Sequence, residues 1–278
     1  DYRIGSVAKV GGSYGMLMTD ILPARDDQGQ VLLNYSDTRR AVYERRSGVV
    51  QELGDMQPDF LGSMSTSLRW KNLSLHVGLD MRIGGLVAMY SNRYGSNAGW
   101  TKTSLKYRDA ASGGLTWTSQ YAGGSNGITY EDGVILEGVF APGTSATGID
   151  GKSHDISGMT HQQAIDAGII EPTHASAYHV FRNSWGEGVV NDDWVHELSY
   201  IALRDITLSY RMPKSIASKI GAKGLNLSLA ARNVGYIYNS LPNNVHPESV
   251  RGNRSAEFRI RGYEPYIRNY TFTINAEF

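Results

Sequence analysis

The chain has 278 residues, and its 27 lysines and arginines balance its 27 aspartates and glutamates. This balance argues against nucleic acid or another polyanion as a partner. No apolar run approaches the ~18 residues that a transmembrane helix needs, and the absence of cysteine excludes disulfide frameworks and cysteine-based zinc sites. The 32 glycines and 17 tyrosines fit a β-rich chain, whether its strands face lipid or belong to a soluble module.

Strands are predicted wherever apolar and polar residues alternate, because successive side chains of a strand point to opposite faces. The clearest alternation runs from Leu73 to Ile83, where six apolar residues occupy every second position. The two residues Lys71-Asn72 join this segment to the one before it, which predicts a tight hairpin. In chain order, the predicted strands are about Tyr2–Met18 (the weakest), Phe60–Trp70, Leu73–Ile83, Ile206–Met212, Leu225–Arg232 and Tyr270–Phe278.

Two short helices are predicted between these strands. The segment from Thr160 to Gly168 begins with a residue that caps helix N-termini and ends with a glycine, which favours a helix end. A second helix of one or two turns is expected after Pro213 and ends at Gly221. The long segment that contains the first helix holds four of the five tryptophans, so it is expected to have structure of its own.

The final segment, Tyr270 to Phe278, alternates without a break and ends on an aromatic residue. Nine residues are about the length of a strand that crosses a bilayer at a tilt. Such an ending resembles that of bacterial outer-membrane β-barrels, whose periplasmic turns are short and whose external loops are long. Counting back from this strand predicts three long external connections, at about 23–57, 91–197 and 240–267, and short periplasmic turns at 71–72 and 214–224.

Five sequence blocks follow one another between residues 58 and 278. They are Pro58-Asp-Phe-Leu-Gly62, Asp80-Met-Arg-Ile-Gly-Gly85, Ser199 to Lys214, Leu229-Ala-Ala-Arg-Asn-Val234, and Tyr263-Glu-Pro-Tyr266 with the final strand. Together and in this order, the blocks resemble the SusC/RagA family of TonB-dependent outer-membrane transporters. Ala202 departs from the family pattern, in which arginine is usual, and Ala231-Arg232 replace a Gly-Gln pair.

The resemblance implies an all-β fold, an antiparallel transmembrane β-barrel in which residues 1–278 form the C-terminal six strands of a 22-stranded plugged barrel. The plug and the earlier strands would lie outside this chain, in an N-terminal part of the same transporter. We expect Phe278 to be the end of the whole protein and Asp1 not to be its beginning. Six strands cannot close around a lumen, so the chain is expected to need that N-terminal part as a partner.

The same resemblance implies function at the cell outer membrane. The family imports large nutrients, here an oligosaccharide or an oligopeptide, with a SusD-like surface lipoprotein as a lid and with energy supplied through TonB. Two alternatives remain open from the residues themselves. One is a passive porin or structural outer-membrane barrel, and the other is a soluble β-rich glycan-binding module.

Catalysis has little support, because the chain lacks the serine elbow, the zinc-binding helix motif and a phosphate-binding glycine loop. No enzyme activity and no cofactor are therefore expected. Four histidines of the long connection invite a metal hypothesis, but no pair has the helical spacing of a metal motif, so no metal site is expected. These histidines are His154, His161, His174 and His179.

Charged residues on the polar side of the predicted strands form a first group of candidates. They could line a transport path, but polar groups on the inner face of a barrel more often pair with one another, with a plug or with water. These lumen-facing candidates are His76, Asp80, Arg82, Arg211 and Arg232.

Aromatic residues form two further groups. Residues near the strand ends fit a girdle at the membrane interface, where tyrosine and tryptophan rings are favoured. These are Trp70, Tyr236, Tyr238, Tyr270 and Phe278, with Tyr266 beside them.

The aromatic residues of the 91–197 connection could contact a ligand or the lid, since flat rings stack on sugars and dominate protein contacts. The plainer interpretation, favoured for any single residue, is that they form the connection's own small core. The candidates are Trp100, Trp117, Tyr121 and Trp185.

Overall fold

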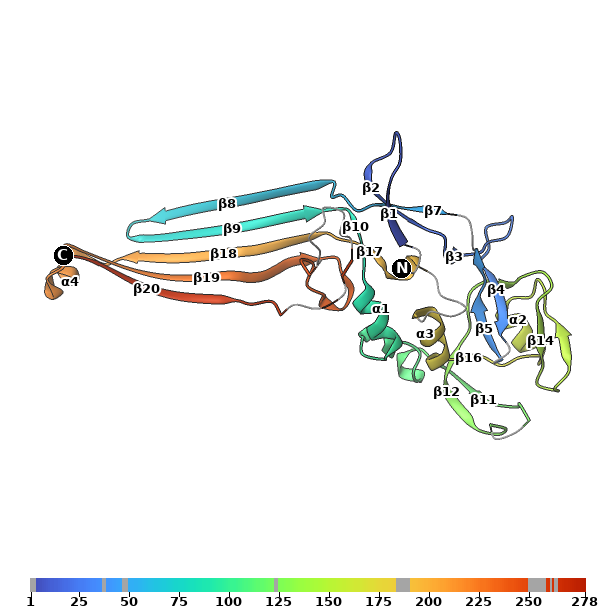
Figure 1. The fold of residues 1–278 in the computed structure, drawn as a ribbon. Helices are drawn as coiled ribbons and strands as arrows, with labels where there is room; N and C mark the ends of the chain where they lie inside the picture. Colours follow the sequence, from blue (N-terminus) through green and yellow to red (C-terminus); the bar gives the residue numbers. More distant parts are fainter. Residues whose placement is uncertain are drawn as a thin grey trace. The chain divides into compact units, whose positions relative to one another are not determined.

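A computed structural model describes residues 4–36, 39–46, 50–122, 125–183, 191–249, 259–260, 262 and 265–278 (Figure 1). The chain divides into two compact units, which we treat separately. The sheet unit comprises residues 55–88 and 196–278, and the connector unit comprises residues 1–54 and 89–195. Strands dominate both units, as the all-β prediction requires. No helix in the described ranges is long and apolar enough to cross a membrane.

The sheet unit is built on one antiparallel sheet of five long strands that lie side by side (Figure 1). The order of the strands across the sheet is β20-β19-β18-β9-β8, so each strand lies beside the next strand of this sheet along the chain. The strands are β8 (Phe60–Trp70), β9 (Leu73–Ile83), β18 (Tyr200–Arg211), β19 (Gly224–Asn239) and β20 (Asn269–Glu277).

The register of the five strands gives the sheet one apolar face and one polar face. A row of apolar residues crosses all five strands: Leu68, Leu75, Leu208, Leu229 and Phe272. The neighbouring row is polar or small on every strand: Ser67, His76, Thr207, Ala230 and Thr271.

The apolar face is exposed rather than covered by other parts of the sheet unit. Leu68 is 61% exposed, Leu229 54% and Phe272 62%, although all three lie within long paired strands. In these rows the alternation predicted from the sequence is confirmed. It separates a polar face from an apolar face that the described residues leave exposed.

The sheet is open in the described part of the chain, with β8 at one edge and β20 at the other. It has five strands, so the prediction of six strands in one sheet is wrong. The segment predicted as the weakest strand instead forms a hairpin of β1 (Ile4–Ala8) and β2 (Tyr14–Thr19), which pairs with β7 (Gln51–Asp55) in the connector unit. A turn at Gly11-Gly12, where Gly12 N–H donates to Lys9 O, reverses the chain there.

Smaller elements complete the sheet unit. β10 (Leu86–Ala88) pairs with β17 (Val195–Glu197). The predicted helix after Pro213 is confirmed as α4 (Lys214–Ala217), continued by a 3₁₀ turn to Ile220 and ended by Gly221 at φ 76°. The predicted Lys71-Asn72 hairpin joins β8 to β9, with Lys71 at φ 53°.

The connector unit combines short sheets with three helices. Its helices are α1 (Tyr90–Asn97), α2 (His161–Asp166) and α3 (Ala175–Asn183). The α2 helix confirms its prediction, because Thr160 and Gln163 form a reciprocal capping box at its start. The remaining strands are β3 (Leu22–Pro23), β4 (Leu32–Ser36), β5 (Arg40–Tyr43), β6 (Arg45–Arg46), β11 (Leu115–Thr118), β12 (Thr129–Val134), β13 (Val139–Phe140), β14 (Ser145–Thr147), β15 (Ser153–Asp155) and β16 (Thr173–His174).

The two long connections predicted at 23–57 and 91–197 share one hydrophobic core. Leu33 and Tyr35 come from the first, whereas Phe140, Ile156 and Ile170 come from the second, and all five are buried. The parallel pairing of β4 with β13, with Leu33 opposite Phe140, joins the two connections through the backbone as well. They are therefore one folded unit and not two independent loops.

Candidate functional site

Three of the sequence blocks converge at the end of the sheet where β8 starts and β9 ends. Gly84 and Gly85 both have positive φ, at 78° and 83°, a conformation that side chains strongly disfavour. Gly84 N–H donates to Ser199 Oγ at 2.8 Å. Arg82 donates to the carbonyl oxygens of Met56 and Leu198, at 2.9 and 3.2 Å. The Gly-Gly pair thus lies where side chains of two blocks, Arg82 and Ser199, bind backbone groups, and the first block joins them through the pairing of Phe60 with Ile83.

All five charged candidates lie on the polar face of the sheet, as the sequence predicted. Three of them are engaged with neighbours: His76 with Ser67 and Asp205, Asp80 with Arg204, and Arg82 with backbone carbonyls. Arg232 lies opposite Asp205 in the register, and Arg211 lines a pocket at the other end of the sheet. Their role in transport stays a prediction.

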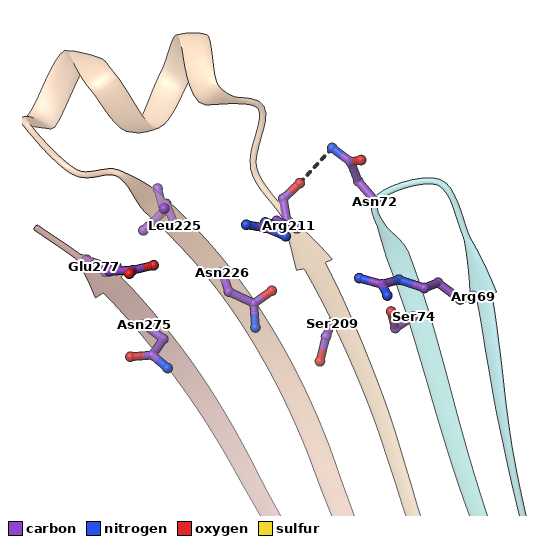
Figure 2. Close-up of a pocket in the computed structure, with 11 residues that line it drawn as sticks. Arg69, Asn72, Ser74, Ser209, Arg211, Leu225, Asn226, Asn275 and Glu277 are labelled. Atoms are coloured by element: carbon purple, nitrogen blue, oxygen red, sulfur yellow. Dashed lines mark hydrogen bonds between the residues drawn. The ribbon is translucent and has the colours of Figure 1, made fainter.

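A concave pocket of about 700 Å³ lies on the polar face beside the short turns (Figure 2). Two arginines, Arg69 and Arg211, face one acid, Glu277, and the other contributors are mostly amides and hydroxyls. Asn72 Nδ2 donates to Arg211 O at 2.9 Å and so joins two turns of the sheet. Such a surface can hydrogen-bond water or the polar surface of another domain. Its other labelled residues are Ser74, Ser209, Leu225, Asn226 and Asn275.

A charged cluster that the sequence reasoning missed is centred on Arg204. Its guanidinium binds both oxygens of Glu248, at 2.8 and 2.5 Å, and Asp80 Oδ2 at 2.5 Å. Arg204 sits in a β-bulge, because the register of β18 shifts between Leu203 and Asp205 against both neighbours. The adjacent charges Arg204-Asp205 break the alternation in the sequence, and this break is the signal that would have revealed the bulge.

The Arg204 cluster holds the start of the predicted 240–267 connection against the polar face. Tyr236 Oη donates to Glu248 Oε2 at 2.7 Å and lies 3.1 Å from His246 Nδ1. Asn239 Nδ2 donates to Val245 O at 2.9 Å. Residues 240–249 of this connection therefore fold over the polar face instead of extending away from it.

The placement of Tyr236 corrects its assignment to the aromatic girdle. It lies opposite Ala202 on the polar face, and its ring packs on those of His246 and Tyr266. Plain alternation already puts Tyr236 on this face, because it lies four residues after Arg232, whereas the register shift between Ile201 and Ala202 puts Tyr238 on the apolar face. Tyr266 joins the same polar-face cluster. The other girdle candidates are exposed by half or more: Trp70, Tyr238, Tyr270 and Phe278.

The cluster around Glu248 predicts an acid-sensitive contact. Burial opposes ionisation of Glu248, but the hydrogen bonds from Arg204 and Tyr236 outweigh it and lower the pKa of this carboxyl. Burial also lowers the pKa of His246, with Glu248 acting in the opposite direction. In both cases the folded state binds protons less readily than the unfolded state. Stability is therefore full above the unfolded pKa and is lost as pH falls.

As the pH falls from 7 to 4, we expect the free energy that protects the amides of residues 240–249 from exchange to fall by about 1 kcal/mol. The effect is this small because solvent screens partly exposed charges. The loss begins below about pH 6.5 with His246 and continues below about pH 4.5 with Glu248. Hydrogen exchange, corrected for intrinsic rates, measures it. Glu248→Gln should abolish the second phase and leave the first. Protection that stays constant down to pH 4 in the unaltered protein would contradict the expectation.

The aromatic candidates of the connector unit fall in different surroundings. Trp100 is 85% exposed, whereas Tyr121 is 7% exposed and its hydroxyl lies 2.9 Å from that of Tyr35. Trp117 stacks on Tyr130, with ring centroids 5.1 Å apart, and contacts His174. Trp117 and Tyr121 line one small cleft together, and Trp100 does not. Trp185 lies outside the described residues.

The four histidines of this connection are separately engaged. His154 pairs with Asp150, His174 with Asp132, and His179 lies 2.8 Å from Lys106 O. His161 is buried, and its Nδ1 accepts from Leu136 N–H at 3.0 Å. Burial lowers the pKa of His161 to about 4. Within the described ranges, no group of three or more histidines, aspartates and glutamates is arranged to hold a metal ion.

Comparisons with known proteins yielded structural similarities alone. No protein-family model and no curated protein match the sequence. One similar solved structure is the "open-open" state of the RagAB peptide importer, with 14% identity and a TM-score of 0.48 over 99% of this chain and 24% of that chain. Its "closed-closed" state gives 14% and 0.44 over 99% and 22%. The chain thus spans about a quarter of the length of those chains. At these TM-scores, we transfer neither fold nor function from them.

Proposed function

We propose that this chain forms barrel wall and external connections of an outer-membrane importer of the SusC/RagA type. The importer takes up oligosaccharides or oligopeptides with a SusD-like lipoprotein lid and draws energy through TonB. The observation that carries the proposal is the uninterrupted apolar row from Leu68 to Phe272 on one face of an open five-stranded sheet.

The exposed apolar face supports contact with lipid. Contiguous exposed apolar patches larger than a few hundred Å² mark protein or membrane interfaces. A strand needs about 9–11 residues to cross a bilayer, and the five strands have between 9 and 16 residues. The polar face, with its paired charges and its pocket, suits the interior of a barrel.

The open edges support a partner that supplies further strands. In lipid, each unpaired backbone group of an edge strand costs several kcal/mol, so membrane-spanning sheets close on themselves. Strands β8 and β20 present such edges. An N-terminal part of the same transporter would pair with them, and a plug would meet the polar face.

Spin labels placed on neighbouring residues of β20 test the two faces directly. We expect Phe272→Cys and Thr271→Cys, each carrying a nitroxide spin label in the full-length protein in bilayers, to differ in accessibility. The label at 272 should collide with dissolved oxygen, which concentrates in lipid, and the label at 271 with a water-soluble nickel chelate. Equal exposure of both labels to the chelate would exclude a lipid-facing sheet and favour a soluble module.

A second measurement separates an energised importer from a passive porin. Uptake of a labelled oligomeric nutrient should stop when a protonophore collapses the inner-membrane proton gradient. Uptake that continues unchanged would favour the porin. If uptake continued while the labels at 271 and 272 still differed in accessibility, the proposed energy coupling would be wrong and the proposed membrane location would stand.

A further inference from the structure

A small cleft in the connector unit brings together residues that are far apart in the sequence. It has a volume of about 180 Å³, enough for about six water molecules at ~30 Å³ each. Residues from three stretches line it: the turn between β4 and β5, the segment 117–125 and the segment 171–174. A cleft of this size accepts one side chain or chain end and not a whole oligomer.

The cleft presents a cation that is held in place. Arg39 lies at φ 60° in the turn between β4 and β5, where its N–H donates to Ser36 O at 2.9 Å. The centre of its guanidinium is 4.5 Å from the centroid of the Tyr121 ring, a cation–π contact that orders the side chain. The described residues include no carboxylate in ion-pair contact with Arg39.

The carboxylate of the cleft, Glu171, already accepts hydrogen bonds from the protein. Glu171 is 8% exposed, and its carboxylate accepts from Ser119 Oγ at 3.1 Å and from the backbone N–H groups of Gln120 and Tyr121. These donors compensate its charge and fix the segment that carries Tyr121. Glu171 is therefore not available to pair with Arg39, and Arg39 is the group of the lining that suits an anion.

The surroundings favour a carboxylate on a short apolar stem over a sugar ring. A sugar needs an open aromatic face and several hydrogen-bonding partners. Tyr121 offers no open face, because it is buried and lies under Arg39, and Ser119 is engaged with Glu171. Trp117 and Pro172 provide apolar wall for a stem.

We propose that this cleft binds a carboxylate of an acidic peptide, with Arg39 as its cation. Arginine presents its N–H groups in a planar fork that matches the two oxygens of a carboxylate. The choice of a nutrient peptide as ligand rests on the proposed import function. The geometry of the cleft and of Arg39 does not depend on that function.

The test compares two capped peptides on the full-length protein in detergent, by isothermal titration calorimetry. The probes are acetyl-Ala-Ala-Glu-Ala-Ala-amide and the same peptide with Gln, so that they differ in one charge. We expect the Glu peptide to bind about tenfold more tightly, since an exposed charge-assisted hydrogen bond contributes at the lower end of its range. Arg39→Gln should erase this preference. Arg25→Gln, a matched exposed arginine that bonds Gly29 O in its own turn, should retain it.

Three results would overturn the proposal. The Glu and Gln peptides could bind the unaltered protein equally, the preference could survive Arg39→Gln, or trigalacturonate could bind where the Glu peptide does not. A salt series on the unaltered protein makes the test independent of folding in the variants, because the preference should shrink as ionic strength rises. Binding is measured without transport, so this proposal and the import function can fail separately.

Discussion

Phe140→Ala is expected to destabilise the connector unit by about 3–5 kcal/mol, the usual cost of truncating a fully buried phenylalanine. Phe140 is 0% exposed and lies in the core that the two long connections share. Its ring contacts those of Tyr35 and His161, with centroids 6.3 and 6.0 Å apart. The loss should therefore spread to both connections and not stay near residue 140.

Hydrogen exchange on the full-length protein measures this effect segment by segment. Protection should fall together around β4 and around α2, because one core supports both. Phe272→Ala is the matched control: it removes the same side chain from an exposed position on the apolar face of the sheet, and connector protection should stay unchanged. A loss confined to the 91–197 connection would show that the two connections do not share their stability.

Leu229→Arg is expected to impair membrane assembly by about 2–4 kcal/mol, the cost of an arginine on the lipid side of a barrel strand near the bilayer midplane. Leu229 is 54% exposed and lies between Leu208 and Phe272 in the apolar row. At 1.4 kcal/mol per factor of ten, the folded fraction at equilibrium in lipid vesicles should shift by about 30- to 700-fold.

The matched control places the same residue one position away. Ser228 lies on the polar face, opposite Ser209 and Thr273, so Ser228→Arg should cost less than about 1 kcal/mol. Equilibrium unfolding in urea from vesicles of defined composition gives both values. Equal costs at the two positions would mean that the apolar row does not face lipid.

The local elements were predicted well because their signals lie in neighbouring residues. The period-two pattern identified the five strands of the sheet and assigned its two faces, since a strand alternates its side chains whatever its partners are. The Lys71-Asn72 hairpin and the helix capped by Thr160 were likewise predicted from a few adjacent residues.

The assignment of Tyr236 to the girdle departed from the alternation itself, because Tyr236 lies four residues after Arg232 and shares its polar face. Another error arose where one residue changed the alternation: the bulge at Arg204 puts two consecutive charged residues on the polar face. A shift of one residue reverses every later side chain of a strand. At the start of the chain, the Gly11-Gly12 turn divided one expected strand into a hairpin.

By itself, the sequence determined the amphipathic strands, their two faces and the short turns, because these depend on contacts between near neighbours. Three features could be seen only in the tertiary structure: the shared core of the two long connections, the ion pair between Arg204 and Glu248, and the cleft in which Arg39 contacts the Tyr121 ring. The partners in these contacts are 44 residues apart for Arg204 and Glu248 and 86 apart for Tyr35 and Tyr121. Such pairings depend on how distant segments pack, and no local pattern of residue types encodes them.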